Sequence, residues 1–273
     1  MTLGENKKTL NRIQQSDIDA NGHFKVPDGI ILIRHCAAIE VKELLKSIDL
    51  NEVTTIGDMA FDGCVNLERV EGTPSAVGFR SFNDCEKLTS FDFSNVSKID
   101  ISAFSRCGFV EVFLPAAKQI PAKCFGDCKN LEKVVGSPVH IGPNAFSKCE
   151  KLTEFDFSNT TSIEGSAFFE SGLKEAVIPT VKNITTGAFA RCGNLEKVVC
   201  TPKLVDDSAF LGCTKLTDFD FSGVEVIYAN SFKDSGLRNA VTENDEVVRI
   251  SHNGYEATFA KTHNRSCAKR VVV

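Results

Sequence analysis

Apolar and small residues recur along this chain at a nearly constant spacing. In each copy a small residue precedes a phenylalanine, and in most copies a cysteine follows three residues later. The phenylalanines are 21 or 22 residues apart and are Phe61, Phe82, Phe104, Phe125, Phe146, Phe168, Phe189, Phe210 and Phe232. A regular repeat of this length predicts that each copy forms one turn of a stacked structure.

Further fixed positions predict the elements of each turn. Ile or Val stands five residues before the Phe, and Leu or Phe follows it by five or six residues. A short alternating run comes next, as in residues 131–136 and 152–158, and Pro, Ser-Asn or Ser-Gly ends many of these runs. Alternation over about six residues predicts one half-buried strand. We therefore expect a strand, a corner and a tight turn around the Phe in every repeat.

A longer period, made of three successive repeats, lies over the first. Asn-Leu-Glu begins at positions 66, 130 and 194, Phe-Asp-Phe-Ser begins at 91, 155 and 219, and Ser-Gly-Leu begins at 171 and 235. Matching residues thus return after three turns, so the simplest explanation is duplication of a three-turn unit. We call the turns that begin at Phe61, Phe82 and Phe104 the first, second and third turns of a block.

The motif Ile-x-x-x-Ala-Phe-x-x-Cys-x-x-Leu, present at residues 56–67 and 141–152, resembles the BspA-like (treponemal-type) leucine-rich repeats. The resemblance covers about residues 40–242. It implies a β-rich leucine-rich-repeat solenoid of the α/β type, a right-handed curved superhelix. Each 21–22-residue turn would place one short parallel strand on the concave face and a short helical or 3-10 turn opposite. The family is associated mainly with bacterial and protist surface or secreted proteins that bind host or matrix proteins, and it carries no catalytic motif.

The two ends of the chain differ from the repeat. We expect residues 1–55 to form an N-terminal lead and cap with a zeroth turn, residues 56–242 to form nine repeats in three 64-residue blocks, and residues 243–273 to form a C-terminal cap. Residues 24–33 predict a strand interrupted by a Pro-Asp-Gly turn, residues 36–46 have helical spacing, and residues 45–50 fit a strand. Such caps would cover the otherwise open ends of the core.

Composition favours a core role for the aromatic residues and cysteines. The chain has 21 Phe and no Trp. Besides the repeated column, six more Phe are expected to point inward: Phe91, Phe93, Phe155, Phe157, Phe219 and Phe221. Seven of the 11 Cys belong to the repeat. Neighbouring turns lie about 4.8 Å apart, whereas a disulfide requires Cβ atoms about 3.8 Å apart, so we expect these thiols to stay reduced.

The sequence predicts no cofactor and no metal. Cys124 and Cys128 have a spacing that zinc could use, but both occupy columns of the repeat. Many unpaired thiols favour a reducing compartment. The N-terminal segment up to His23 lacks the apolar stretch of a signal peptide, and no apolar run is long enough to cross a membrane. We expect a cytoplasmic location or export without a Sec signal; a secreted or cell-surface location follows if a leader has been removed.

The outward positions of the predicted strands form two columns. The first holds Glu111, Lys133, Glu154, Glu175, Lys197 and Asp218, and the second holds Phe113, Val135, Asp156, Val177, Val199 and Asp220. Exposed apolar side chains among acids are typical of an interaction surface, although the first column could also be a solvated ladder that neutralises itself. The acidic excess, with a net charge of −5 for the chain, favours a basic protein or peptide and argues against nucleic acid. These twelve residues are the candidate partner-binding site.

We therefore predict a non-enzymatic protein–protein interaction module that binds through its concave sheet, in the manner of a bacterial virulence or adhesion factor or an effector. The main alternative is a structural or self-associating solenoid that works through its edges. A weaker alternative is enzyme activity in the C-terminal segment, where His252, His263 and Cys267 have no visible third group. The partner's identity and the oligomeric state stay open at this point.

Overall fold

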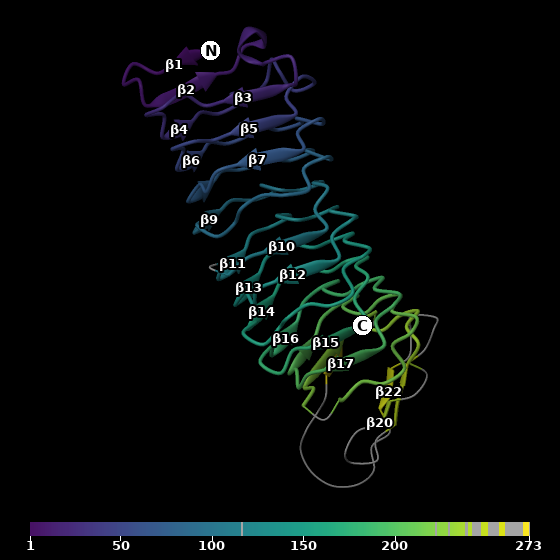
Figure 1. Cartoon of the computed structure of the whole chain (residues 1–273). Coiled ribbons are helices and arrows are strands. Elements are labelled where there is room, and N and C mark those ends of the chain that lie inside the picture. The colour runs from purple at the N-terminus through teal and green to yellow at the C-terminus, as the bar shows by residue number, and fades with distance from the viewer. Residues whose placement is uncertain are drawn as a thin grey trace. The chain divides into compact units, whose positions relative to one another are not determined.

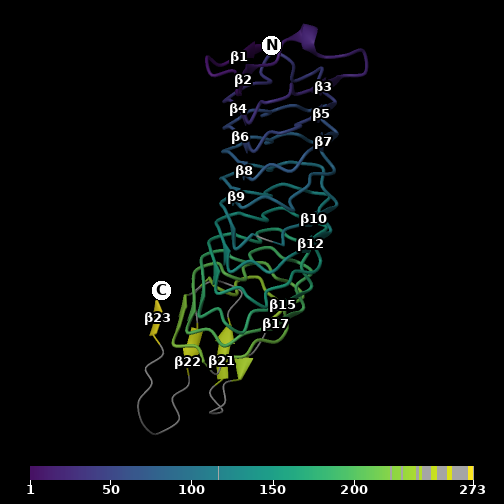
Figure 2. The same cartoon turned by 60° about the vertical axis from the view of Figure 1, so that its left-hand side comes forward.

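The computed structural model describes residues 1–115, 117–221, 223–228 and 230–237, and the backbone of a few short strands beyond them. The chain divides into two compact units, Met1–Gly136 and Ser137–Val273. Each unit is built of stacked turns, which Figure 1 labels by their strands and Figure 2 shows after a rotation of 60°. The expected solenoid of stacked turns with parallel strands is confirmed.

In the first unit, two ladders of short strands run along the stack. The three-residue strands pair in parallel as β3 (His23–Lys25), β5 (Ser47–Asp49) and β7 (Arg69–Glu71), and as the separate pair β10 (Glu111–Phe113) and β12 (Lys133–Val135). The second ladder begins with antiparallel β1 (Thr2–Leu3) and β2 (Thr9–Arg12). It continues in parallel through β4 (Leu32–Ile33), β6 (Thr55–Ile56), β8 (Ala76–Val77) and β9 (Lys98–Ile99), and β11 (Gln119–Ile120) has the same place in its own turn.

The second unit repeats this arrangement. Its three-residue strands are β15 (Glu175–Val177) and β17 (Lys197–Val199), which pair in parallel. The other ladder contains the pair β13 (His140–Ile141) and β14 (Ser162–Ile163), and the parallel series β16 (Asn183–Ile184), β18 (Leu204–Val205), β19 (Val226–Tyr228) and β23 (Arg270–Val272). Strands β20 (Ala240–Val241), β21 (Val247–Ile250) and β22 (Ala257–Phe259) form an antiparallel sheet.

Short helices were expected on the side of the turns opposite the three-residue strands, and this expectation is wrong. The described residues contain a single short 3-10 helix, η1 (Gln15–Asp17), in the N-terminal segment. Elsewhere the opposite side is made of turns and of the second ladder, most of whose strands the sequence did not predict. The interrupted strand expected at residues 24–33 is present as β3 and β4, one in each ladder. The helix expected at residues 36–46 is also wrong, because the Ala38 N–H donates to the Ala60 carbonyl of the next turn at 2.9 Å. The strand expected at residues 45–50 is present as β5.

The phenylalanine column forms the spine of each core. Adjacent rings stack nearly parallel, with centroids 5.2 Å apart for Phe61 and Phe82 and 5.6 Å apart for Phe168 and Phe189. The paired Phe of the second turns, such as Phe155, pack edge-on against this stack, as expected from the sequence. Ring contacts of this kind add to the hydrophobic gain from burial, so the column holds successive turns together.

The cysteine column links each turn to the one before it. Cys85 donates its thiol hydrogen to the carbonyl of Phe61 at 3.2 Å, and Cys192 does the same to Phe168 at 3.0 Å. Two residues before and two residues after most repeat Phe, the backbone is left-handed, as at Ser166 (φ 58°) and Glu170 (φ 56°) around Phe168. These bends make the turn tight enough for the thiol to reach back into the core.

The three-turn period has a structural cause. Second turns carry two inward Phe and no three-residue strand; in the first unit only an isolated bridge joins Arg69 to Ser90. Third turns carry a glycine that approaches the second turn, since a Cβ at Gly172 would overlap the carbonyl oxygen of Glu150. Gly108 stands in the same relation to Glu86. Second and third turns are thus shaped to fit one another.

Candidate interaction groove on the strand face

The twelve candidate residues lie on the outward side of the three-residue strands and of the equivalent second-turn segments, a surface that we call the strand face. Eleven of them are exposed and Val135 is half-buried. Glu111, Phe113, Lys133 and Val135 belong to β10 and β12 of the first unit. The other eight belong to the second unit, where β15 and β17 carry Glu175, Val177, Lys197 and Val199, and second-turn segments carry Glu154, Asp156, Asp218 and Asp220.

Ion pairs join adjacent strands of this face. Lys133 Nζ lies 2.9 Å from Glu111 Oε1 in the first unit, and Lys197 Nζ lies 2.7 Å from Glu175 Oε1 in the second. In both pairs the side chains are about half exposed or more, so each contributes at most about 1 kcal/mol to stability. Their main effect is to neutralise the lysines, which leaves the face acidic.

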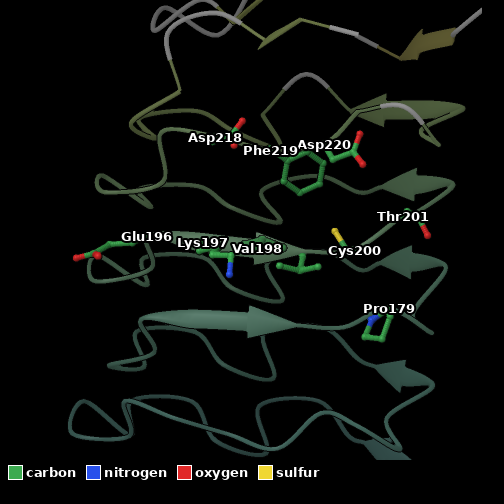
Figure 3. Close-up of a pocket in the computed structure, with 10 residues that line it drawn as sticks. Pro179, Glu196, Lys197, Val198, Cys200, Thr201, Asp218, Phe219 and Asp220 are labelled. Atoms are coloured by element: carbon green, nitrogen blue, oxygen red, sulfur yellow. The ribbon is translucent and has the colours of Figure 1, made fainter. Parts of the chain in front are cut away.

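A groove opens on the strand face of the second unit, beside β17. Its volume is about 310 Å³. Figure 3 shows that β17 and the segment after it form one wall, that Asp218, Phe219 and Asp220 of the next turn form the other, and that Pro179 of the preceding turn lies at the end near Cys200. The residues that line it are Pro179, Glu196, Lys197, Val198, Val199, Cys200, Thr201, Asp218, Phe219 and Asp220.

The groove forms where the ladder of three-residue strands stops. β17 pairs with β15 on one side, but residues 218–220 belong to a second turn and form no strand. The core side of this turn is occupied by Phe219 and Phe221, which are 5% and 1% exposed. The strand face is therefore continuous from β15 to β17 and hollowed beyond β17.

Cys200 makes the base of the groove apolar. The corresponding residues of the two earlier blocks are Gly72 and Gly136, both with positive φ, whereas Cys200 has a buried side chain that is 4% exposed. Burial raises the pKa of the Cys200 thiol to about 12, and the negative charge of Asp220 contributes to this rise. The thiol is therefore neutral at physiological pH and acts as a small apolar group.

The groove combines this apolar base with an acidic rim. Val199 is 41% exposed beside it, and Val177 on the neighbouring strand is 46% exposed. The charged residues of the lining are three acids, of which Glu196 lies 3.7 Å from Lys215 Nζ, and Lys197, which Glu175 already neutralises. Asp218 and Asp220 therefore supply most of the negative charge of the rim. A site with these features suits a partner segment in which an apolar side chain stands next to a positively charged one.

Other kinds of site find little support in the described part of the chain. No group of three or more His, Cys, Asp or Glu there is placed to hold a metal ion. Cys124 and Cys128 are both buried in the core, where desolvation raises their thiol pKa values. His252, His263 and Cys267, the residues of the weaker enzyme hypothesis, lie outside the described residues. Within the residues searched, no helix has the length and apolar character needed to cross a membrane.

Comparison with known proteins identifies the family. The model of the BspA type leucine-rich repeat region matches residues 20–132 and 139–261, with six copies. A leucine-rich cell surface protein from Faecalibacterium prausnitzii has a similar structure, with 20% identity, 96% of each chain covered and a TM-score of 0.50. A leucine-rich repeat protein from Bacteroides ovatus is 19% identical, with 88% of this chain and 86% of that chain covered and a TM-score of 0.47.

No curated protein matches the chain. The family match spans most of the sequence, and members of this family are not known as enzymes. The chain belongs to the BspA-type leucine-rich repeat family.

Proposed function

We propose that this chain is a non-enzymatic interaction module that binds a basic protein or peptide through its strand face, with the groove beside β17 as the anchor point. The single observation that carries the proposal is that exposed Val199, an apolar base and exposed acids meet in one groove. Interfaces typically bury apolar anchors inside a polar rim. The family and the fold, which present surfaces, support the same interpretation.

The shape of the groove indicates which part of a partner it would hold. It runs beside the three-residue strand β17 and is open to solvent along the strand face. An extended segment with an apolar side chain directed at Cys200 and Phe219 could place a neighbouring Lys or Arg against Asp218 or Asp220. Charge complementarity of this kind sets orientation and association rate more than affinity.

A role in adhesion or virulence would require this face to meet a partner outside the cell. The similar protein from F. prausnitzii is described as a cell surface protein. Burial of nine of the ten described cysteines would protect those thiols from oxidation in such a setting. We therefore infer that an extracellular position is chemically compatible with this core.

The test uses peptides selected from a random library against the intact chain. Val199→Glu places a charge at the groove without entering the core, and affinity for the selected peptides should fall at least about tenfold, the scale of an interface hot spot. Val139→Glu is the matched control, since Val139 is 40% exposed in the same unit but lies beside the other ladder. Fluorescence anisotropy on labelled peptides measures both variants.

Charge supplies the second half of the test. Selected peptides should be enriched in Lys and Arg, and Asp218→Asn should slow their association and weaken its dependence on salt. Peptides that bind Val199→Glu as well as they bind the unaltered chain would place the site elsewhere. Self-association in sedimentation experiments that Val199→Glu abolishes and Val139→Glu preserves would favour a second copy of the chain as the occupant of this face.

A further inference from the structure

One cysteine of the first unit does not share the environment of the others. Nine of the ten described cysteines are buried, and Cys36 alone is partly exposed. Cys36 stands two residues before Ala38, which occupies the position of the repeat Phe, so it lies outside the repeated cysteine column. The packing role that explains the other cysteines therefore does not explain Cys36.

An imidazole lies directly against this thiol. Cys36 Sγ is 3.1 Å from His35 Nε2, and His35 Nδ1 is 3.1 Å from the carbonyl oxygen of Asp58 on the next turn. A carbonyl oxygen can only accept a hydrogen bond, so Nδ1 must carry the proton. In the neutral ring this leaves the Nε2 lone pair to accept the thiol hydrogen of Cys36.

The backbone of the neighbouring turns fixes this pair. The Cys36 N–H also donates to the Asp58 carbonyl at 3.2 Å, and the Arg12 guanidinium donates to the Cys36 carbonyl at 3.1 Å. Gly57 allows the next turn to pack closely, since a Cβ there would lie 2.7 Å from the Ile33 carbonyl oxygen and 3.1 Å from the His35 nitrogen. The backbone that carries the thiol and the imidazole is thus held by contacts from the turns on both sides.

We propose that Cys36 is a site of reversible covalent modification by small soluble disulfides, with His35 as the base that activates the thiol. His35 Nε2 takes the proton of Cys36, and the thiolate attacks one sulfur of the disulfide R–S–S–R. A new bond forms between Cys36 Sγ and that sulfur while the R–S–S–R bond breaks. The proton held by His35 passes to the departing thiolate, giving Cys36–S–S–R and R–S–H with no further oxidant.

The core thiols cannot compete in this reaction. Burial raises the pKa of Cys64 and of Cys128 to about 12, and that of Cys192 to about 11. The thiolate is the nucleophile in thiol–disulfide exchange, so these side chains are both unreactive and inaccessible at neutral pH. The structure therefore makes Cys36 the selective target among the described cysteines.

The experiment treats the full chain with glutathione disulfide at neutral pH and follows intact mass with peptide mapping. We expect a glutathione adduct on Cys36 that dithiothreitol removes, with the mapped core cysteines unmodified. Cys36→Ser should abolish that adduct, whereas Cys213→Ser, at a buried thiol of the repeated column, should leave its rate unchanged. Faster modification of core cysteines than of Cys36 would overturn the proposal.

His35→Gln tests the base. This side chain can still form a hydrogen bond but cannot take up a proton at neutral pH, so Cys36 modification should slow by about tenfold or more. The dependence of this rate on pH should also become steeper than in the unaltered chain, because no side chain beside Cys36 then takes up the thiol proton. The charged groups near the pair, Arg12, Arg34, Glu40 and Asp58, are unchanged in both proteins. An unaltered rate and pH profile in His35→Gln, or a Cys36 rate no higher than that of free glutathione, would refute the assignment.

Discussion

Replacing Phe104 by Ala should cost more than almost any other single change in the first unit. The side chain is fully buried. It stacks on Phe82 and Phe125 with centroids 5.4 and 5.9 Å away, and it forms T-shaped contacts with Phe91 and Phe93 at centroid distances of 4.9 and 5.0 Å. A buried Phe→Ala change costs about 3–5 kcal/mol, and each ring pair adds about 0.5–1.5 kcal/mol beyond burial. We therefore expect Phe104→Ala to lower the free energy of unfolding by about 5 kcal/mol, the upper end of the range for a buried Phe→Ala change.

Guanidinium denaturation followed by far-UV circular dichroism measures this loss, because the chain has no Trp and only two Tyr to report by fluorescence. The m-value is followed with the midpoint, since a smaller m-value would show unfolding in steps. Phe113→Ala is the control: it removes the same side chain at a position that is 53% exposed and should cost less than about 1 kcal/mol. Equal losses for Phe104→Ala and Phe113→Ala would refute the view that the phenylalanine column carries the stability of the stack.

Two more predictions concern the fit between turns and the core thiols. Gly172→Ala should destabilise the second unit by about 1–3 kcal/mol, because the new Cβ would overlap the Glu150 carbonyl. Gly193→Ala is the control and should be close to neutral, because the nearest atom to a Cβ there is 3.9 Å away. Equal denaturation midpoints for the two variants would contradict the close approach at Gly172. The unfolding free energy should also fall as pH rises from about 9 towards 12, because the unfolded chain loses its thiol protons near the ordinary pKa of 9.0 while burial holds the pKa of Cys128 at about 12. Cys128→Ser should lessen this fall, and the same pH slope in both proteins would show that the buried thiol is not its source.

The core and the orientation of the strand face follow directly from the sequence. The Phe column and the inward second-turn Phe could be predicted because the same residue types recur at fixed positions in every turn. Outward positions such as Val177 and Val199 followed from alternation within each short strand, and both are exposed. A single copy is too short to distinguish the spacing of a strand from that of a helix, but the same pattern in every copy makes the assignment clear.

The N-terminal segment shows why a helix was expected where none forms. Ala37, Ala38, Val41 and Leu45 are all buried, with a spacing that an amphipathic helix would also give. They occupy the positions that Ala, Phe, Cys and Leu take in later turns, so the spacing belongs to the repeat. Their backbone groups bond to neighbouring turns, as between Ala38 and Ala60. The two-residue strands of the second ladder were missed because two residues are too few to show alternation.

The groove beside β17 could not be predicted from the sequence. The alternation at residues 218–221 is as regular as in any other turn, yet this segment does not join the ladder. The groove depends on which neighbouring turns pair through backbone hydrogen bonds. Second turns, which carry the extra Phe-Asp-Phe pair, do not form a three-residue strand, whereas first turns, which lack this pair, do. One visible signal was Cys200, where the earlier blocks have Gly72 and Gly136.

The fit between second and third turns limits how the length of such a chain can change. In the second unit, the third turn around Phe168 follows the second turn around Phe146 and precedes the first turn around Phe189. A junction between a third turn and a first turn therefore already exists. Removing or inserting one whole block of three turns recreates only junctions of this kind. Removing a single turn would instead set Gly172 against a neighbour that does not fill the space left by its missing side chain. Natural and engineered variants of this chain should therefore differ in length by whole blocks.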